Sequence, residues 1–242
     1  QIPQGKVVVQ LFGSINTTAE FPRYLEAPLF QWEQQDLAFV GLPHRYDSWG
    51  IRQDWGDTVL LKAWSEIELP AGEYQFLARS RGMSRLTIDD KVLLTTAQQK
   101  GRGSAHNSVV DLPKVPVVGM RPHWMNDKEA LATFTSKGGR HRVVFEAIVG
   151  GPGFRLEVGE SVVAIARPDE MFHVLAEKLT YPLTDQGWSA LFQKQRETLR
   201  QLDWQQRQQA NQYQAPYWDR RHKHARQTLL SKSSVSSIDG LI

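Results

Sequence analysis

The stretch AGEYQFLARSRGMSRLTIDDKVLLTT, residues 71–96, predicts two antiparallel β-strands joined by a glycine turn. Tyr74 and Phe76 are two residues apart, so both rings lie on the same side of the first strand and supply a large buried area. Gly82 permits the backbone conformation that a tight turn needs. The second strand runs into Asp89 and Asp90, where a second turn is expected.

The same alternation of apolar and polar residues recurs through residues 1–165. Turn signals rich in glycine and proline separate the runs, and no run is followed by the helical pattern that a parallel sheet requires. We therefore expect an all-β sandwich or barrel built from antiparallel strands. The apolar runs are KVVVQLF (6–12), TVLLKAWSEIEL (58–69), EYQFLARS (73–80), SRLTIDDKVLL (84–94), HRVVFEAIV (141–149) and FRLEVGESVVAIA (154–166).

The composition excludes several classes of protein. The 242 residues include no cysteine, so disulfides, thiol nucleophiles and thiolate zinc sites are absent. No segment approaches the roughly 20 apolar residues of a membrane-spanning helix. The chain starts at Gln1, which suits a processed secretory product. We expect an exported protein, periplasmic or extracellular.

From residue 185 onward the pattern becomes helical. Thr184 or Asp185 is a suitable N-cap, and Pro216 is expected to interrupt the helix before a second helical piece that could fold back as a hairpin. Residues 185–230 hold eight Lys and Arg against four Asp and Glu, a net charge of +4. The expected interaction surface is the apolar stripe of this segment, which should pack against the sandwich, the second helix or a neighbouring chain: Trp188, Leu191, Phe192, Leu199 and Leu202.

The block from Trp64 to Leu94 resembles the PA-fourteen domain, a β-sandwich family named after anthrax protective antigen. The resemblance covers roughly residues 5–165 and implies the sandwich rather than the barrel. The matching residues are Trp64-Ser65, Pro70-Ala71-Gly72, Tyr74, Phe76, Ser80, Arg85-Leu86 and Ile88-Asp89-Asp90-Lys91, followed by Gly139-Arg140-His141-Arg142-Val143 and the glycine-rich turn from Gly150 to Leu156.

In the sugar-binding members of this family, the turn before the Arg-Leu strand carries two adjacent aspartates that hold calcium. Here that turn is Arg81-Gly82-Met83-Ser84, which has no carboxylate. Calcium needs six to eight oxygen ligands, and two arginines close to the turn oppose a cation. We therefore expect no calcium at residues 81–84, and neither a metal nor a cofactor elsewhere.

Residues 44–57, HRYDSWGIRQDWGD, mix aromatic and charged side chains in a loop-like stretch. Exposed aromatic rings can stack on sugars, while the alternatives are that the tryptophans plug the end of the sandwich and that Arg–Asp pairs brace the loop. The cations of the C-terminal segment are mostly dispersed among acids, so we expect no nucleic acid partner. The ligand-binding candidates in the loop are Trp49, Arg52, Asp54, Trp55 and Asp57.

These features favour a non-catalytic binding or interaction module within a larger exported protein, with calcium-independent glycan binding as its first version. The alternatives are a scaffold subunit of a multiprotein assembly and an accessory domain of a carbohydrate-active hydrolase, or a hydrolase with carboxylates in the 44–57 and 121–129 loops. The expected partners are other protein subunits or domains and polysaccharide. The C-terminal texture is also weakly similar to multidomain planctomycete proteins in which such a module accompanies cytochrome-related domains. The expected domains are a sandwich (1–165), a connector (166–184), a helical extension (185–230) and a linker or further segment (231–242).

Overall fold

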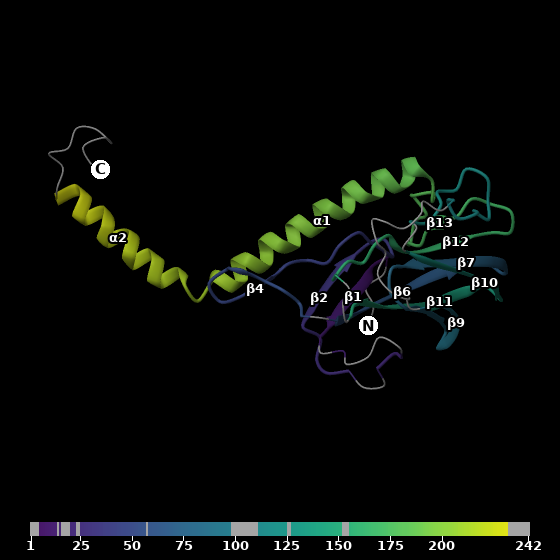
Figure 1. Cartoon of the computed structure of the whole chain (residues 1–242), viewed down its shortest axis with the longest axis horizontal. Coiled ribbons are helices and arrows are strands. Elements are labelled where there is room, and N and C mark those ends of the chain that lie inside the picture. Colours follow the sequence, from purple (N-terminus) through teal and green to yellow (C-terminus); the bar gives the residue numbers. More distant parts are fainter. Residues whose placement is uncertain are drawn as a thin grey trace. The chain divides into compact units, whose positions relative to one another are not determined.

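The computed structural model describes residues 5–13, 15, 20–22, 25–56, 58–97, 111–124, 127–151 and 155–231. The chain divides into two compact units. Unit 1 comprises residues 1–42 and 55–200, and unit 2 comprises residues 43–54 and 201–242. Figure 1 shows the strands of unit 1 and the two long helices that follow them in sequence.

Unit 1 contains a six-stranded antiparallel sheet whose centre is formed by two long strands, β6 (Thr58–Leu69) and β11 (Gly139–Gly150). Twelve residue pairs join them, from Gly139 opposite Leu69 to Gly150 opposite Thr58. The remaining strands of this sheet are β1 (Val7–Phe12), β2 (Phe30–Gln34), β8 (Ser84–Ile88) and β9 (Lys91–Thr96), in the order β2-β1-β6-β11-β8-β9.

The second sheet is built around β7 (Gly72–Ser80), with β10 (Lys128–Ser136) on one side and β12 (Ser161–Ala166) on the other. Two short strands, β3 (Ala38–Phe39) and β13 (His173–Val174), pair with β12. Phe39 of this sheet stacks on Phe145 of the first, with ring centroids 6.2 Å apart. The fold is therefore an antiparallel β-sandwich, as predicted, and the segment expected as a connector (166–184) contributes a strand to it.

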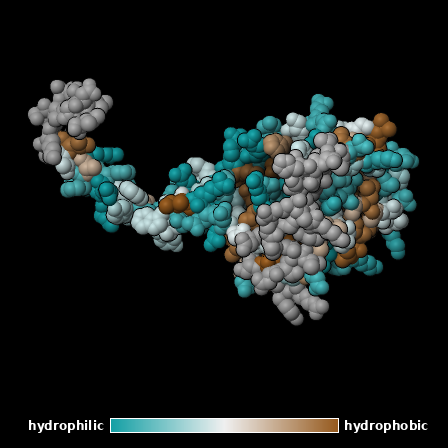
Figure 2. Space-filling view, viewed as in Figure 1, coloured by the Kyte–Doolittle hydropathy of each residue, from teal (hydrophilic) through white to brown (hydrophobic). Residues whose placement is uncertain are grey.

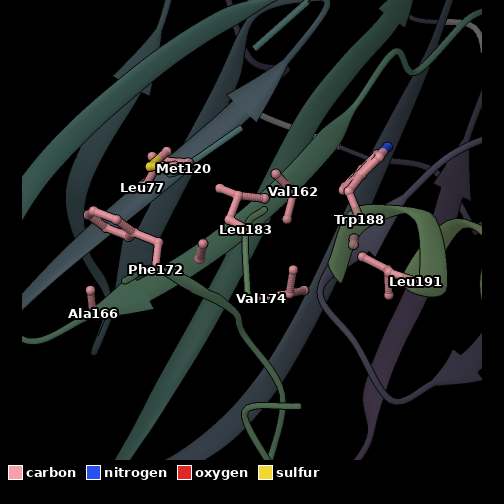
Figure 3. Close-up of a cluster of buried hydrophobic side chains, with 11 residues drawn as sticks. Leu77, Met120, Val162, Ala166, Phe172, Val174, Leu183, Trp188 and Leu191 are labelled. Atoms are coloured by element: carbon pink, nitrogen blue, oxygen red, sulfur yellow. The ribbon is translucent and has the colours of Figure 1, made fainter. Parts of the chain in front are cut away.

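The helix α1 (Asp185–Asn211) begins at the predicted cap, because the backbone N–H of Gly187 donates to Thr184 Oγ1 at 3.1 Å. Its first turns cover the outer face of the second sheet. Trp188 and Leu191 are buried there among side chains of β7, β12 and β13, including Leu77 and Val162 (Figure 3). All six residues of β12 are buried, because one face meets the other sheet and the other face meets this cluster.

Unit 2 contains the hairpin of β4 (Arg45–Tyr46) and β5 (Arg52–Gln53), the last residues of α1, and α2 (Ala215–Ser231). Pro216 stands in the first turn of α2, where a missing N–H costs little, so the interruption is where it was predicted. Every residue from 215 to 227 is exposed, so within the described chain α2 does not bury a row of side chains as the predicted helical hairpin would. Within the same ranges, no helix combines the length and apolar character needed to cross a membrane.

Candidate functional site

The turn between β7 and β8 lies at one end of the sandwich and is fixed by close packing. A Cβ on Gly82 would lie 1.9 Å from the carbonyl oxygen of Ile148, so only glycine fits beside β11. The N–H of Ile148 donates to the carbonyl of Met83 at 2.9 Å. The glycine is therefore required by the approach of two backbones.

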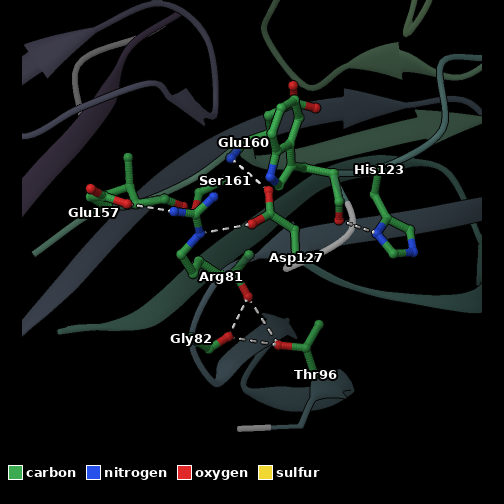
Figure 4. Close-up of polar contacts among 11 residues, drawn as sticks. Arg81, Gly82, Thr96, His123, Asp127, Glu157, Glu160 and Ser161 are labelled. Carbon is green, nitrogen blue, oxygen red and sulfur yellow. Dashed lines mark hydrogen bonds and ion pairs between the residues drawn. The ribbon is translucent and has the colours of Figure 1, made fainter. Parts of the chain in front are cut away.

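Three buried hydroxyls, those of Ser80, Ser84 and Thr96, hold the same turn from inside. Thr96 Oγ1 lies 3.0 Å from Ser80 Oγ and 2.8 Å from Ser84 Oγ, and it accepts from the N–H of Ser84 at 2.8 Å. Ser80 Oγ donates to the carbonyl of Gly82 at 2.7 Å. Figure 4 shows Thr96 and Gly82 in this arrangement. The turn is thus a rigid platform for the side chain that it carries outward, Arg81.

Arg81 connects two carboxylates from different loops (Figure 4). Its Nε donates to Asp127 Oδ1 at 3.1 Å, and its Nη1 donates to Glu157 Oε2 at 2.6 Å. The Asp127 side chain is fully buried, and its other oxygen accepts from the N–H of Glu160 at 2.8 Å. Gly159 has φ +64°, and a Cβ there would lie 2.5 Å from Asp127 Oδ1. Asp127 therefore orients both the arginine and the loop that carries Glu157.

Arg121 forms a second bridge at the same end of unit 1. Its guanidinium pairs with Glu160 and with Asp185 at the start of α1. The hydrogen bond to Glu160 is the main reason that the pKa of Arg121 is raised above its ordinary value, against the opposing effect of burial, and the bond to Asp185 raises it further. The two arginines thus hold the 155–160 loop between the β7–β8 turn and the first helix.

The exposed side chains beside these ion pairs have mixed character. Trp124 is 53% exposed, and its carbonyl accepts from the N–H of Asp127 at 2.8 Å, so the indole and the buried carboxylate belong to one short turn. Arg155 is almost fully exposed and lies 3.8 Å from the half-exposed carboxylate of Glu157. We call Arg81, Trp124, Arg155 and Glu157, with the buried Asp127, the Arg81 cluster. It presents an aromatic ring, hydrogen-bond donors and a carboxylate acceptor.

No three His, Asp or Glu side chains of the described residues gather as metal ligands would. In the Arg81 cluster, the carboxylates of Asp127 and Glu157 already accept from the guanidinium. The guanidinium of Arg81 therefore lies between these two carboxylates and supplies the positive charge there without a bound metal ion.

A Ser–His–Asp chain occurs at a different place, between two hairpin turns. His141 lies with Nε2 2.8 Å from Ser136 Oγ and with Nδ1 2.6 Å from Asp89 Oδ2. Ser136 is 3% exposed, and its Oγ also accepts from the N–H of Gly138 at 2.9 Å. A nucleophile must reach its substrate, so this buried hydroxyl is a structural group that joins the two turns.

Asp89 and Asp90 form the two-residue turn between β8 and β9, with φ +47° and +63°. Such turns usually take asparagine or glycine. Burial acts to raise the pKa of Asp89, but hydrogen bonds from His141 and from the N–H of Arg142 outweigh it, and the pKa lies below its ordinary value. The first aspartate is therefore explained by His141, while Asp90 makes a single distant ion pair to Arg142, at 3.9 Å.

The residues proposed from the 44–57 loop are distributed over both units. Trp49, Arg52 and Asp54 belong to unit 2 and are exposed, on or beside the β4–β5 hairpin. Asp47 braces that hairpin by accepting from the N–H groups of Trp49 and Ile51, each at 2.9 Å.

Trp55 belongs to unit 1, where it is buried and lies with its ring 6.2 Å from that of Phe30. Asp57 lies outside the described residues. The structure thus brings Trp49 and Arg52 together on one hairpin and places Trp55 in packing.

The helical stripe is also divided. Trp188 and Leu191 are buried against the second sheet, whereas the Phe192 side chain is 36% exposed. Leu199 is half-buried in unit 1 and packs beside Gly41, since a Cβ on that glycine would lie 3.2 Å from Leu199 Cδ1. Leu202 is half-buried in unit 2.

The sequence analysis named residues 81–84 as a turn without a calcium ligand, but it did not propose Arg81 as a binding residue and it missed Asp127, Glu157 and Arg121 as neighbours of this turn. Arg81 and Asp127 are 46 positions apart, and no local motif connects them. One signal was available: Gly159 stands two residues after Glu157, and an isolated glycine near a polar loop often marks a close contact.

No protein-family model and no curated protein sequence matches this chain. Among solved structures, the chain is similar to a PA14 sugar-binding domain from an RTX adhesin, at 10% identity and a TM-score of 0.44, over 72% of this chain and 97% of that one. It is also similar to the PA14 domain of the MpAFP antifreeze protein, at 11% identity and a TM-score of 0.43, over 74% and 96%. A third similar structure is an anti-sigma factor domain-containing protein from Clostridium clariflavum, at 15% identity and a TM-score of 0.43, over 75% and 49%.

Proposed function

We propose that this chain is a non-catalytic carbohydrate-binding module of a larger exported protein, and that it binds its glycan at the Arg81 cluster without calcium. The observation that carries the proposal is the ion-paired guanidinium of Arg81, whose partner Asp127 lies in the same hydrogen-bonded turn as the exposed Trp124. Sugars are recognised by rings that stack on their apolar faces and by charged or polar groups that bind their hydroxyls.

The cluster supplies both kinds of contact. Trp124 exposes about half of its surface, and its backbone is fixed by the hydrogen bond from Asp127. Arg81 is a quarter exposed and Glu157 about half exposed, so a ligand hydroxyl can reach a donor and an acceptor that are already oriented. Ordering these groups before the ligand arrives reduces the entropy cost of binding.

The resemblance of residues 64–94 to the PA-fourteen family supports the same end of the sandwich as a binding surface, because the family's calcium turn corresponds to residues 81–84. In this chain the cation that stands between carboxylates is Arg81. Binding would therefore depend on direct hydrogen bonds and stacking, with no metal bridge to the hydroxyls.

The test is a glycan array probed with the full chain in EDTA and, separately, with calcium. We expect the same glycans to bind in both buffers. The Trp124→Ala variant should weaken binding by roughly tenfold, the loss of about 1–2 kcal/mol that one stacked ring provides. The matched control is Trp49→Ala, which removes an equally exposed tryptophan from unit 2.

Three outcomes would contradict the proposal. The first is an array with no glycan bound. The second is binding that requires calcium. The third is equal weakening by Trp124→Ala and Trp49→Ala, which would place the ligand away from the Arg81 cluster or on no defined site.

A further inference from the structure

The helix α2 is unusual in exposing all of its charged and aromatic side chains. Every residue from 215 to 227 is exposed, including both aromatic residues, Tyr217 and Trp218. A helix of 17 residues is marginally stable alone in water, so this one is expected to gain stability from a ligand or partner. Figure 2 shows the α2 stretch as mostly hydrophilic and intermediate in hydropathy, found by its place in Figure 1.

The charge of α2 indicates the kind of ligand. The helix carries four cations and one anion, a net charge of +3 with neutral histidines: Arg220, Arg221, Lys223 and Arg226 against Asp219. Successive residues of a helix are about 100° apart, so these four cations extend around more than half of its circumference. A ligand that matches them must offer several anions that can follow or surround the helix.

The aromatic side chains of α2 hold Arg221 in place. Arg221 Nη1 donates to the hydroxyl of Tyr217 at 3.0 Å, and its guanidinium lies 5.9 Å from the centre of the Trp218 ring. The Trp218 ring also lies edge-on to Tyr217, with ring centroids 5.2 Å apart, and tilted against His222, with ring centroids 6.1 Å apart. Both rings therefore have neighbours within the helix while they stay exposed, and the guanidinium is oriented before a ligand arrives.

We propose that α2 is a binding element for an acidic polysaccharide, whose carboxylate or sulfate groups pair with Arg220, Arg221, Lys223 and Arg226. Arginine matches planar or tetrahedral oxyanions through two parallel hydrogen bonds, and a polysaccharide chain presents such groups repeatedly. This site is independent of the Arg81 cluster, because it lies wholly in unit 2 and uses charge rather than stacking.

Other occupants fit the helix less well. A helix that lies in a bilayer surface needs a broad apolar face, and here Trp218, Ala225 and Leu229 form a narrow one. Single-stranded nucleic acid is bound by aromatic faces on which bases stack, whereas the exposed ring of Trp218 already has Arg221 and His222 as neighbours within the helix. A second copy of α2 would bring net positive charge against net positive charge.

The test measures binding of the full chain to immobilised heparin, which carries sulfates and carboxylates, and to polygalacturonate, which carries carboxylates alone. Dextran serves as the neutral polymer. We expect binding to at least one acidic polymer, weaker at high salt, and none to dextran. The triple variant Arg220→Gln, Lys223→Gln, Arg226→Gln should weaken binding by about a hundredfold, on the order of fivefold for each cation lost.

The matched control removes three exposed lysines from unit 1, Lys128→Gln, Lys137→Gln and Lys178→Gln, and has the same net charge as the α2 variant. It should bind nearly as well as the original chain. Circular dichroism of both variants checks that helix content is unchanged, because a melted α2 would imitate a lost contact.

Several results would overturn the proposal. These are no binding to either acidic polymer, equal weakening by the two triple variants, and tighter binding to single-stranded DNA or to phosphatidylglycerol vesicles than to the polysaccharides. Trp124→Ala separates the two sites: it should leave acidic-polymer binding unchanged even if the glycan array finds no ligand for the Arg81 cluster.

Discussion

Replacement of Asp127 by Asn tests whether this buried carboxylate organises the Arg81 cluster. The side chain is fully buried, and its two oxygens accept from Arg81 Nε and from the N–H of Glu160. Asparagine has nearly the same shape but one acceptor oxygen and an NH₂ group. In either orientation the amide would therefore place a donor against a donor, and the charge opposite Arg81 would be lost.

The expected cost follows from these contacts. A hydrogen bond to a charged group contributes about 1.5–3 kcal/mol, and breaking a buried ion pair costs about 3–5 kcal/mol. Arg81 keeps its bond to Glu157 and is a quarter exposed, so its charge is not stranded. We therefore expect Asp127→Asn to lower the free energy of unfolding by about 2–4 kcal/mol. The variant should also weaken glycan binding, since the 155–160 loop loses its anchor.

Urea unfolding followed by tryptophan fluorescence measures the stability of unit 1, which holds Trp32, Trp55, Trp64 and Trp188. The control is Glu157→Gln, because Glu157 pairs with the same arginine but is about half exposed. That exposed pair is expected to contribute less than about 1 kcal/mol. Equal costs for the two variants, or a negligible cost for Asp127→Asn, would refute the idea that the buried carboxylate is the organising group.

Three further predictions concern the frame around the site. Leu191→Ala should lower the free energy of unfolding of unit 1 by about 3 kcal/mol, because the side chain is fully buried. Leu202→Ala should lower it by less than about 1 kcal/mol, because that side chain is only half-buried. Similar values for the two variants in urea titrations would contradict the assignment of the helix start to the sandwich core. Asp90→Gly should stabilise the β8–β9 turn by about 0.5–1 kcal/mol, visible as a higher Tm, because its φ of +63° suits glycine; an unchanged or lower Tm would show that Asp90 has a role beyond its weak ion pair. The pKa of Asp89 is depressed in the folded protein, so its bond to His141 stabilises the fold above the unfolded-state pKa and is lost as pH falls through the folded-state pKa. The free energy of unfolding should therefore fall less steeply below about pH 4 in Asp89→Asn than in the original chain. Parallel pH profiles of the two proteins would refute this link.

Local patterns predicted the fold because they depend on near neighbours. Tyr74 and Phe76 alternate with polar residues and are buried on one face of β7. Thr184 precedes an amphipathic run, and its hydroxyl accepts the N–H of Gly187. Periodicity and capping act within a few residues, so a single sequence contains the information that they require.

The site depends on distant pairs and was therefore less accessible. The sequence showed that residues 81–84 lack a carboxylate, but it could not show that Asp127 meets Arg81, because the two residues are 46 positions apart and are brought together by the tertiary fold. Composition also suggested Trp49 and Trp55 as equivalent members of one loop, whereas one is exposed in unit 2 and the other is buried in unit 1. Burial depends on tertiary packing, and the residue type alone does not distinguish a buried tryptophan from an exposed one.

An arginine between carboxylates differs from a bound metal in what it can do for a ligand. Its charge is present at any calcium concentration, because a guanidinium stays protonated and is attached to the chain. It donates hydrogen bonds to oxygen atoms, however, and does not coordinate several of them at once as calcium does. Asp127 and Glu157 already use part of its hydrogen-bonding capacity. The proposed glycan site should therefore bind a single sugar weakly and depend strongly on Trp124.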